Sequence, residues 1–305
     1  MDLLVNKYRP LNIESVIGNI STISTLSNII KEKSMPHLLF TGPPGTGKTS
    51  SAKIFAFQLI GSKDGILELN ASDDRGIDTV RTQIKDFSMK KIQTVPFKIV
   101  ILDECDSMTT AAQQAMRRIM ETHSSDCKFI LICNDFSKIF EPIQSRCAVL
   151  RFDKIDTLII ENRLREISKF ENIKLTDEAV NFIIDVSDGD MRQLLNILQT
   201  CINNPNLIDV QYIVKIIGIP SPKLVNEVVN LLLKKNIEEA IEKFEKIWDE
   251  KYDAEDLISS FFRIAKNMEN YEVVKAVGLT HLKIIKGNIS KLIFYGMFYD
   301  ILKVN

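Results

Sequence analysis

The sequence has little that would indicate a disulfide-rich, zinc-binding or membrane-spanning protein. Its five cysteines are odd in number and include no C-x-x-C pair, so a disulfide framework and a zinc site are both unexpected. No apolar run approaches the roughly 20 residues of a membrane-spanning helix. The N-terminus lacks the charged-then-apolar plan of a signal peptide. We therefore expect reduced intracellular thiols and no membrane association.

The chain also lacks a strong charge of either sign. It carries 39 Lys and Arg against 40 Asp and Glu, a formal net charge of −1, so there is no global electrostatic case for nucleic acid. Any nucleic-acid surface must be local or built by several chains together. The 305 residues, 45% of them apolar, predict about two or three domains with sizeable cores.

The strongest pattern in the chain lies between His37 and Phe57. An apolar run indicates a buried strand, G-x-x-x-x-G-K-T follows it, and a helical pattern comes next, which is the context of a P-loop. Glycines let backbone N–H groups turn inward, and with the helix N-terminus they form an anion cradle. Lys48 supplies positive charge for the β- and γ-phosphates, and the Thr49 hydroxyl is placed to ligate Mg²⁺. The predicted nucleotide-binding residues of this loop are Gly42, Pro43, Pro44, Gly45, Thr46, Gly47, Lys48, Thr49 and Ser50. The alternative is an ordinary glycine-rich turn.

A second strand, from Phe97, ends in Asp103 and Glu104, which is the Walker B pattern. The carboxyl end of a parallel strand is the edge at which nucleotides bind. We expect Asp103 to hold Mg²⁺ through water and Glu104 to orient and polarise the attacking water. The tetrad Asp103–Asp106 also resembles that of D-E-x-D helicases, which leaves a DNA-unwinding motor as an alternative.

Other elements of the first half alternate between strands and helices. Strands are expected at 65–69, 127–133 and 148–152, and Asn134 follows the middle one. The Asn134 amide can donate to a phosphate oxygen and accept from a water; an ordinary turn residue is the alternative. The alternation predicts a parallel α/β sheet with helices on both faces.

Two predicted helices of this half carry basic residues. Arg81 and Lys85 lie four apart beside the apolar face of a helix that starts near Ile77. Arg117 and Arg118 lie off the apolar face of a helix at 109–121. On spacing alone, a solvated helix face is the preferred interpretation of the Arg81–Lys85 stripe.

From about Asp153 the strand signal stops and helical periods continue to the end. Gly189 and Asp190 act as helix breaker and N-cap, which places Arg192 near the start of a helix. The Gly218–Pro222 stretch is the best linker candidate. We therefore expect three domains: residues 1–152, 153–218 and 219–305.

Six segments together resemble one family, the small subunits of replication factor C, the sliding-clamp loader, within the AAA+ ATPases. These segments are Lys7–Pro10, Gly42–Thr49, Leu69–Ile77, Leu102–Glu104, Ile143–Cys147 and Gly189–Arg192. The Gly278–His281 stretch is similar to the tail of the eukaryotic small subunit that carries its own Ser-Arg-Cys arginine finger. Cys105 stands where the family usually has alanine and is small enough to pack there.

The resemblance implies an ATPase that works in a heteropentamer, with a helical lid, a helical collar and ATP and Mg²⁺ between neighbouring subunits. Tyr8, Arg9 and Val16 would flank the adenine. Asn134 would be the first phosphate sensor and Arg192 the second. Arg146 would be an arginine finger that reaches the ATP of the neighbouring subunit.

The resemblance also implies the partners. They are the other replication factor C subunits, a sliding clamp (PCNA) and primer–template DNA, in the nucleus. Arg81, Lys85, Arg117 and Arg118 would lie along the DNA backbone, which reverses the interpretation of Arg81 and Lys85 from spacing alone. A subunit that binds ATP without hydrolysing it is an alternative, against which intact Glu104, Asn134 and Arg192 argue. A helicase would need a second motor domain with strands, whereas the second half is predicted to be helical.

Overall fold

A computed structural model describes residues 3–72, 77–90, 92, 95–202, 204–266, 268 and 270–303. The chain divides into two compact units, each of which is described by itself. The first contains Met1–Asn172 and Val186–Gln199, and the second contains Ile173–Asp185 and Thr200–Asn305. The three-domain division expected from the sequence remains a prediction.

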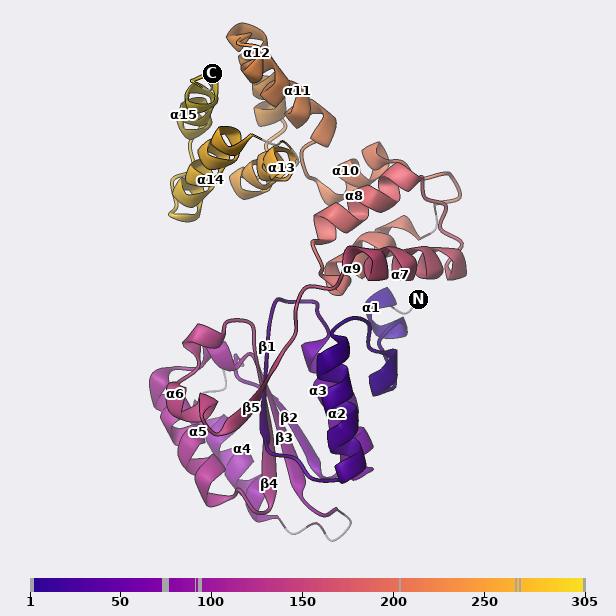
Figure 1. The fold of residues 1–305 in the computed structure, drawn as a ribbon, viewed down its shortest axis with the longest axis vertical. Coiled ribbons are helices and arrows are strands. Elements are labelled where there is room, and N and C mark those ends of the chain that lie inside the picture. The colour runs from indigo at the N-terminus through magenta and orange to yellow at the C-terminus, as the bar shows by residue number, and fades with distance from the viewer. Residues whose placement is uncertain are drawn as a thin grey trace. The chain divides into compact units, whose positions relative to one another are not determined.

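The centre of the first unit is a five-stranded parallel sheet (Figure 1). Its strands lie in the order β2-β3-β4-β1-β5, so the P-loop strand β1 pairs with both β4 and β5. The strands are β1 His37–Thr41, β2 Ile66–Asn70, β3 Lys98–Asp103, β4 Cys127–Cys133 and β5 Cys147–Arg151. Parallel pairing throughout places the residues that follow β1, β3 and β4 at one common edge.

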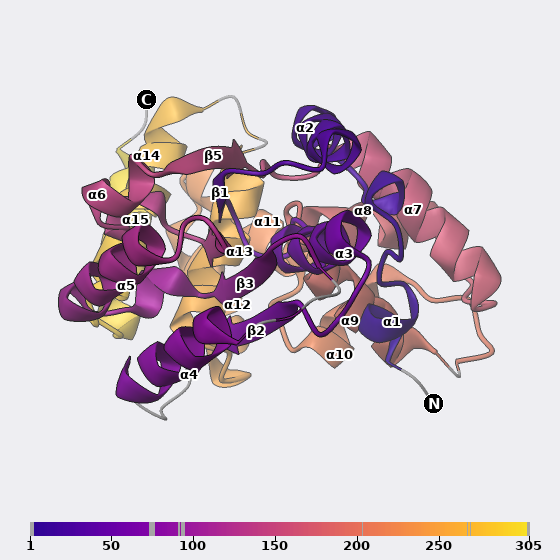
Figure 2. The same ribbon diagram turned by 90° about the horizontal axis from the view of Figure 1, so that it is seen from below.

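Helices cover both faces of this sheet, as Figure 2 also shows. Leu38 and Phe40 point into the core formed with α2 (Ile20–Glu32) and α3 (Lys48–Ile60). Leu39 points into the other core, with α4 (Ile77–Met89) and α5 (Thr110–Thr122). Because successive strand residues face opposite sides, a sheet buried on both faces needs an unbroken apolar run, and β1 and β3 have one. The predicted α/β architecture is confirmed.

Shorter elements and two longer helices complete the first unit. The segment before β5, for which the sequence predicted no element, forms a short helix, α6 (Glu141–Gln144), with Pro142 in its first turn, where proline is tolerated. The remaining elements of this unit are α1 Leu4–Lys7, η1 Ile13–Ser15, η2 Cys105–Ser107, η3 Phe136–Lys138, α7 Thr157–Phe170 and α9 Met191–Cys201, whose last two residues lie beyond the division.

The second unit is helical in the part of the chain that the structure describes, apart from an isolated bridge between Leu175 and Ile208. Its helices are α8 Asp177–Ser187, α10 Val210–Ile217, α11 Pro222–Leu233, α12 Ile237–Asp249, α13 Ala254–Lys266, α14 Tyr271–Ile285 and α15 Lys291–Leu302. The last five share a core centred on buried Phe244, Phe261 and Phe294. No single helix among the described residues has the length and apolar content to cross a bilayer; α10 and α11 do so only as a pair bent by 96°.

Candidate active site

The loop between β1 and α3 requires its glycines. Gly42, Gly45 and Gly47 have φ values of 146°, 68° and 93°, a region that L side chains rarely adopt. A Cβ on Gly42 would lie 1.9 Å from the carbonyl oxygen of Phe152, and one on Gly45 would lie 1.7 Å from a carboxylate oxygen of Asp190. At Gly42 and Gly45 the loop therefore leaves no room for a side chain, as a backbone cradle for phosphate requires.

Lys48 turns its amine into this loop. The side chain is 6% exposed, and Nζ donates to the carbonyls of Gly42 (2.7 Å) and Pro43 (2.6 Å). Burial lowers the pKa of Lys48, and the nearby Asp103 carboxylate opposes that shift. Thr46 donates its hydroxyl to the Pro43 carbonyl at 2.9 Å, which fixes the same turn. A cation thus lies within the anion cradle.

The side chains of Thr49 and Asp103 meet, although β4 lies between β3, which ends at Asp103, and β1, which leads into the P-loop. The Thr49 hydroxyl donates to Asp103 Oδ2 at 2.7 Å, and Asp103 Oδ1 accepts from the backbone N–H of Glu104 at 2.9 Å. A hydroxyl and a carboxylate are hard oxygen ligands of the kind that Mg²⁺ prefers. The predicted Mg²⁺ ligands therefore lie together, and their donor set fits the ion.

Glu104 has an unusual backbone conformation at the end of β3. Its φ of 55° and ψ of 39° are left-handed, although it is not a glycine, and its side chain is exposed. Ser107 donates to the Glu104 carbonyl from its N–H (2.9 Å) and its hydroxyl (2.7 Å), which holds the turn. Such conformations persist where surrounding contacts determine them and are frequent at functional sites.

The neighbouring Cys105 is a packing residue. Its thiol is buried and donates to the Leu102 carbonyl at 3.0 Å. Burial raises the pKa of Cys105 far above its usual range, so the reactive thiolate is not formed. The cysteine packs as the sequence analysis expected.

Asn134 lies exposed just after β4, at the same edge of the sheet. Its backbone N–H donates to Asp106 Oδ2 at 3.1 Å, and that of Asp135 donates to the same oxygen at 3.0 Å. Asp106 therefore ties the segment after β4 to the turn after β3. The sequence analysis connected Asp106 only with helicase tetrads and missed this contact.

The start of α9 lies against the P-loop. Met191 donates its N–H to the Gly45 carbonyl at 3.2 Å. The Asp190 carboxylate caps the helix, because Oδ1 accepts from the N–H groups of Arg192 (2.7 Å) and Gln193 (3.0 Å). The predicted cap is confirmed. Arg192 is exposed and directly follows Met191, which contacts the P-loop.

Two residues of the N-terminal segment contact the P-loop or its helix. Arg9 Nε donates to the Ser50 hydroxyl at 3.2 Å. Val16 Cγ1 lies 3.5 Å from where a Cβ on Gly47 would be. The structure therefore brings Arg9 and Val16 to the nucleotide loop.

Tyr8 instead contacts α7. Its hydroxyl donates to Glu171 Oε1, and the guanidinium of Arg163 lies 5.7 Å from its ring centroid. Burial and the hydrogen bond to Glu171 raise the pKa of Tyr8 to about 12, so the phenol keeps its proton. Lys7 also pairs with Glu171, at 2.6 Å.

Arg146 lies at the end of the sheet opposite the P-loop, where the parallel strands β1 and β5 begin. It precedes β5, and Cys147 pairs with His37, whereas Arg151 pairs with Thr41 beside the P-loop. Four strand residues, about 13 Å, separate these two levels. Arg146 donates to the Pro142 carbonyl (2.6 Å) and forms an ion pair with Glu121 (2.5 Å). The structure therefore does not bring Arg146 to the P-loop of its own chain.

The helices predicted to contact DNA, α4 and α5, pack against each other. Lys85 and Arg118 are exposed, and Arg117 pairs with Glu121 at 3.0 Å. The side chain of Arg81 lies outside the described residues. Glu121, which holds both Arg117 and Arg146, was missed by the sequence analysis because its second partner lies in a distant segment.

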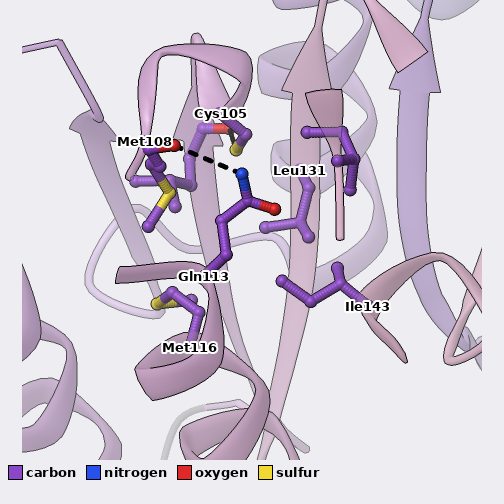
Figure 3. Close-up of a pocket in the computed structure, with 8 residues that line it drawn as sticks. Cys105, Met108, Gln113, Met116, Leu131 and Ile143 are labelled. Carbon is purple, nitrogen blue, oxygen red and sulfur yellow. Dashed lines mark hydrogen bonds between the residues drawn. The ribbon is translucent and has the colours of Figure 1, made fainter. Parts of the chain in front are cut away.

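A small apolar cavity lies behind the ends of β3 and β4 (Figure 3). Gln113 of α5 lines it, although it is polar. Gln113 is 4% exposed and accepts from Phe140 N–H at 2.6 Å while donating to the Lys138 carbonyl at 2.9 Å. Its spacing of three from the buried Met116 is the signal that could have revealed it. The other lining residues are Leu102, Cys105, Met108, Leu131, Ile139 and Ile143.

Comparison with family models gives two matches. Residues 38–155 match the ATPase family associated with various cellular activities (AAA), and residues 220–298 match the replication factor C C-terminal domain. Replication factor C subunit 4 of Encephalitozoon cuniculi is 62% identical over 99% of this chain and 98% of its own length. Subunit 4 of Saccharomyces cerevisiae is 42% identical over 99% and 96%.

More distant similarity extends to archaea and to a solved bacterial structure. The replication factor C small subunit of Methanococcus vannielii is 42% identical over 93% of each chain. Among solved structures, the Thermotoga maritima RuvB Holliday junction branch migration motor aligns with a TM-score of 0.57 at 16% identity, over 77% of this chain and 81% of that one. At this identity the likeness shows the fold alone.

Proposed function

The chain belongs to the replication factor C family of AAA ATPases, and on that premise we propose that it is a small subunit that hydrolyses ATP in the clamp loader. In this proposal the assembled loader opens a sliding clamp (PCNA) and places it on primer–template DNA in the nucleus. The lid at 153–218 closes over the nucleotide, and the collar at 219–305 joins the heteropentamer.

One observation carries the proposal: the nucleotide-binding groups lie at one edge of the sheet and Arg146 lies at the other. In such a subunit, the nucleotide-binding site has no arginine finger of its own, and Arg146 lies away from the nucleotide of its own chain. Neighbours stacked in a ring would supply each other's missing part. Fingers supplied by a partner are worth about 10³–10⁵ in rate.

ATP would bind along the P-loop, with its phosphates on the backbone N–H groups of Gly42 and of residues 45–50, since Pro43 and Pro44 have no N–H. Lys48 would turn from the Gly42 and Pro43 carbonyls to the β- and γ-phosphates. Asn134 and Arg192 would hold the γ-phosphate from two sides. Arg9 and Val16, which contact the loop, would flank the adenine together with Tyr8.

Thr49 and Asp103 would hold Mg²⁺, since their oxygens already meet at 2.7 Å. When bound, the ion would neutralise charge on the β- and γ-phosphates. Glu104 would accept a hydrogen bond from the attacking water and direct its oxygen at the γ-phosphorus. Its exposed position at the strand end leaves room for that water. The products are ADP and phosphate, and phosphoryl transfer needs this positioning more than covalent chemistry.

DNA would bind along α4 and α5 through Arg81, Lys85, Arg117 and Arg118. Such contacts reach phosphates and not base edges, so binding would be independent of sequence and would weaken as salt rises. A loader must work at any primer terminus, which fits this kind of contact. DNA and the clamp would stimulate hydrolysis, and hydrolysis would release the loader.

The test is reconstitution of the chain with its sister subunits, followed by co-purification with a clamp and assay of ATP turnover with and without primed DNA. We expect a stable complex that retains the clamp and hydrolyses ATP faster when primed DNA is present. Failure to associate with any clamp would overturn the loader proposal. Unchanged DNA-stimulated turnover by this subunit's site in the Glu104→Gln complex would instead indicate a non-hydrolysing subunit.

A further inference from the structure

A three-residue cluster joins the C-terminal end of α5 to the segment before β5. Glu121 Oε1 forms an ion pair with a terminal nitrogen of Arg146 at 2.5 Å and accepts a hydrogen bond from Arg117 Nε at 3.0 Å. The other terminal nitrogen of Arg146 donates to the Pro142 carbonyl at 2.6 Å. Glu121 is the member of this cluster to which neither the sequence nor the proposed function gave a role.

These two contacts hold the Arg146 guanidinium in place and leave it able to bind a further partner. A guanidinium has five N–H donors in one plane, and supports on both terminal nitrogens fix the orientation of that plane. The hydrogen bond to Pro142 and the ion pair to Glu121 engage the two terminal nitrogens, and the guanidinium keeps further N–H groups for a phosphate. Glu121 therefore holds the Arg146 side chain in a defined orientation and still leaves it able to bind an anion.

Arg117 offsets the negative charge of the Glu121 carboxylate beside Arg146. A lone carboxylate beside the finger would repel the γ-phosphate that the finger is meant to reach. Because Arg117 donates to the same oxygen, the cluster carries two positive charges and one negative charge. The cluster as a whole stays attractive to phosphate.

The segment that carries Arg146 is attached to α5 at two places. Buried Gln113 holds the Lys138 carbonyl and the Phe140 N–H near one end. Glu121 lies two turns later on the same helix and holds Arg146 itself. Gln113 therefore fixes the backbone of the segment, whereas Glu121, together with the Pro142 carbonyl, fixes the Arg146 side chain.

We propose that Glu121 is a positioning residue for Arg146, which it orients toward the nucleotide of the neighbouring subunit. This inference rests on the proposed in-trans role of Arg146. Exposed ion pairs hold weakly, so the expected contribution is moderate, about twofold to fivefold in turnover, and far below that of Arg146 itself.

The experiment uses the assembled complex, with every ATP site silenced by Walker B Glu→Gln changes except the site that Arg146 faces. We expect Glu121→Ala to lower kcat at that site about twofold to fivefold and to leave KM for ATP unchanged. Glu121→Gln, which keeps a neutral acceptor, is expected to fall between Ala and wild type, and Glu121→Asp to restore part of the rate. Glu68→Gln, which removes an exposed ion pair to Lys53 in the same unit, is the matched control and is expected to have no effect.

The decisive comparison is made in the Arg146→Ala background. There Glu121→Ala is expected to cause no further loss, because the residue acts through Arg146. A further loss in that background would overturn the inference, as would an unchanged kcat for Glu121→Ala beside a strongly reduced one for Arg146→Ala. An unchanged kcat for Arg146→Ala would refute the proposed in-trans finger itself, so the two failures are distinguishable.

Discussion

The sheet of the first unit and the five-helix core of the second are stabilised in different ways. At the carboxyl edge of the sheet, Lys48, Asp103 and Glu104 combine burial, polar contacts and left-handed backbone. In the core of α11–α15 the centroid of the Phe244 ring lies within 6.4 Å of five other aromatic ring centroids, and most of the other buried residues are aliphatic. Groups that can do chemistry gather at the sheet edge, whereas the helical core supplies packing. Four changes can break or sharpen this contrast.

The largest expected effect on activity comes from Lys48→Ala. Loss of the Lys48 amine from the phosphate cradle is expected to lower turnover at this subunit's site by about 10³-fold, as loss of a key transition-state contact does. Circular dichroism is expected to be unchanged. Lys53→Ala, on the same helix but paired with Glu68 at the surface, is the control and should keep wild-type turnover. Equal losses of turnover in both variants would show that Lys48 contributes no more than a surface lysine on the same helix.

The largest expected effect on stability comes from Phe244→Ala. Removing a fully buried phenylalanine from an aromatic core costs about 3–5 kcal/mol, through lost transfer energy and the cavity left behind. Thermal unfolding of the chain is the measurement. Tyr299→Ala, in the same bundle but 60% exposed, should change stability by less than about 0.5 kcal/mol. Similar melting curves for both variants would contradict the account of the helical core.

A smaller effect is expected for Gln113→Ala, which tests whether the sheet unit depends on buried polar contacts. The change leaves the Lys138 carbonyl and the Phe140 N–H without their partner, at a cost of about 1–3 kcal/mol. Chemical denaturation measures the loss. The adjacent Gln114→Ala is exposed and should be neutral. Gln113→Ala stability equal to wild type would mean that water replaces these contacts fully.

The smallest expected effect concerns pH. Burial, and secondarily Lys128, lowers the pKa of His37 from 6.5 to about 4, and its Nδ1 accepts from Phe129 N–H at 3.2 Å. Between these pH values the unfolded chain binds the proton and the folded chain does not, so stability falls as the pH drops from 6.5 toward 4. We expect a loss of about 1–2 kcal/mol, less than the pKa shift alone implies because the ring is half-buried.

The variant His37→Gln tests this pH dependence. An amide has no titration in this range but can still accept from Phe129 N–H. Melting temperatures measured from pH 7 to pH 4 should therefore fall less steeply for the variant than for the wild type. Parallel profiles would show that His37 does not contribute to acid sensitivity.

Local patterns were enough to predict much of this molecule. The P-loop, the carboxylates that end β3, and Asp190 as a helix cap each depend on neighbours in the chain, and the structure has them in the expected elements. Short-range spacing also predicted the parallel α/β sheet, because buried strands and amphipathic helices have distinct periods.

The residues that sequence reasoning missed act across long separations. Asp106 holds Asn134, Gln113 holds Phe140, and Glu121 holds Arg146, and each pair joins two elements through a side chain. No periodicity records such pairs. The helix α6 was missed for a related reason: it is one turn long, too short to show a period. The roles of Arg146 and the basic residues came from family resemblance, and they remain predictions.

The central claim is that this chain needs a neighbour to hydrolyse ATP. The most direct measurement is the ATP turnover of the isolated chain, compared with that of the same chain in the complete loader with clamp and primer–template DNA. The account predicts a rate near background for the isolated chain and a rate about 10³-fold or more higher in the assembly. An isolated chain that hydrolyses ATP as fast as the assembled loader would contradict it.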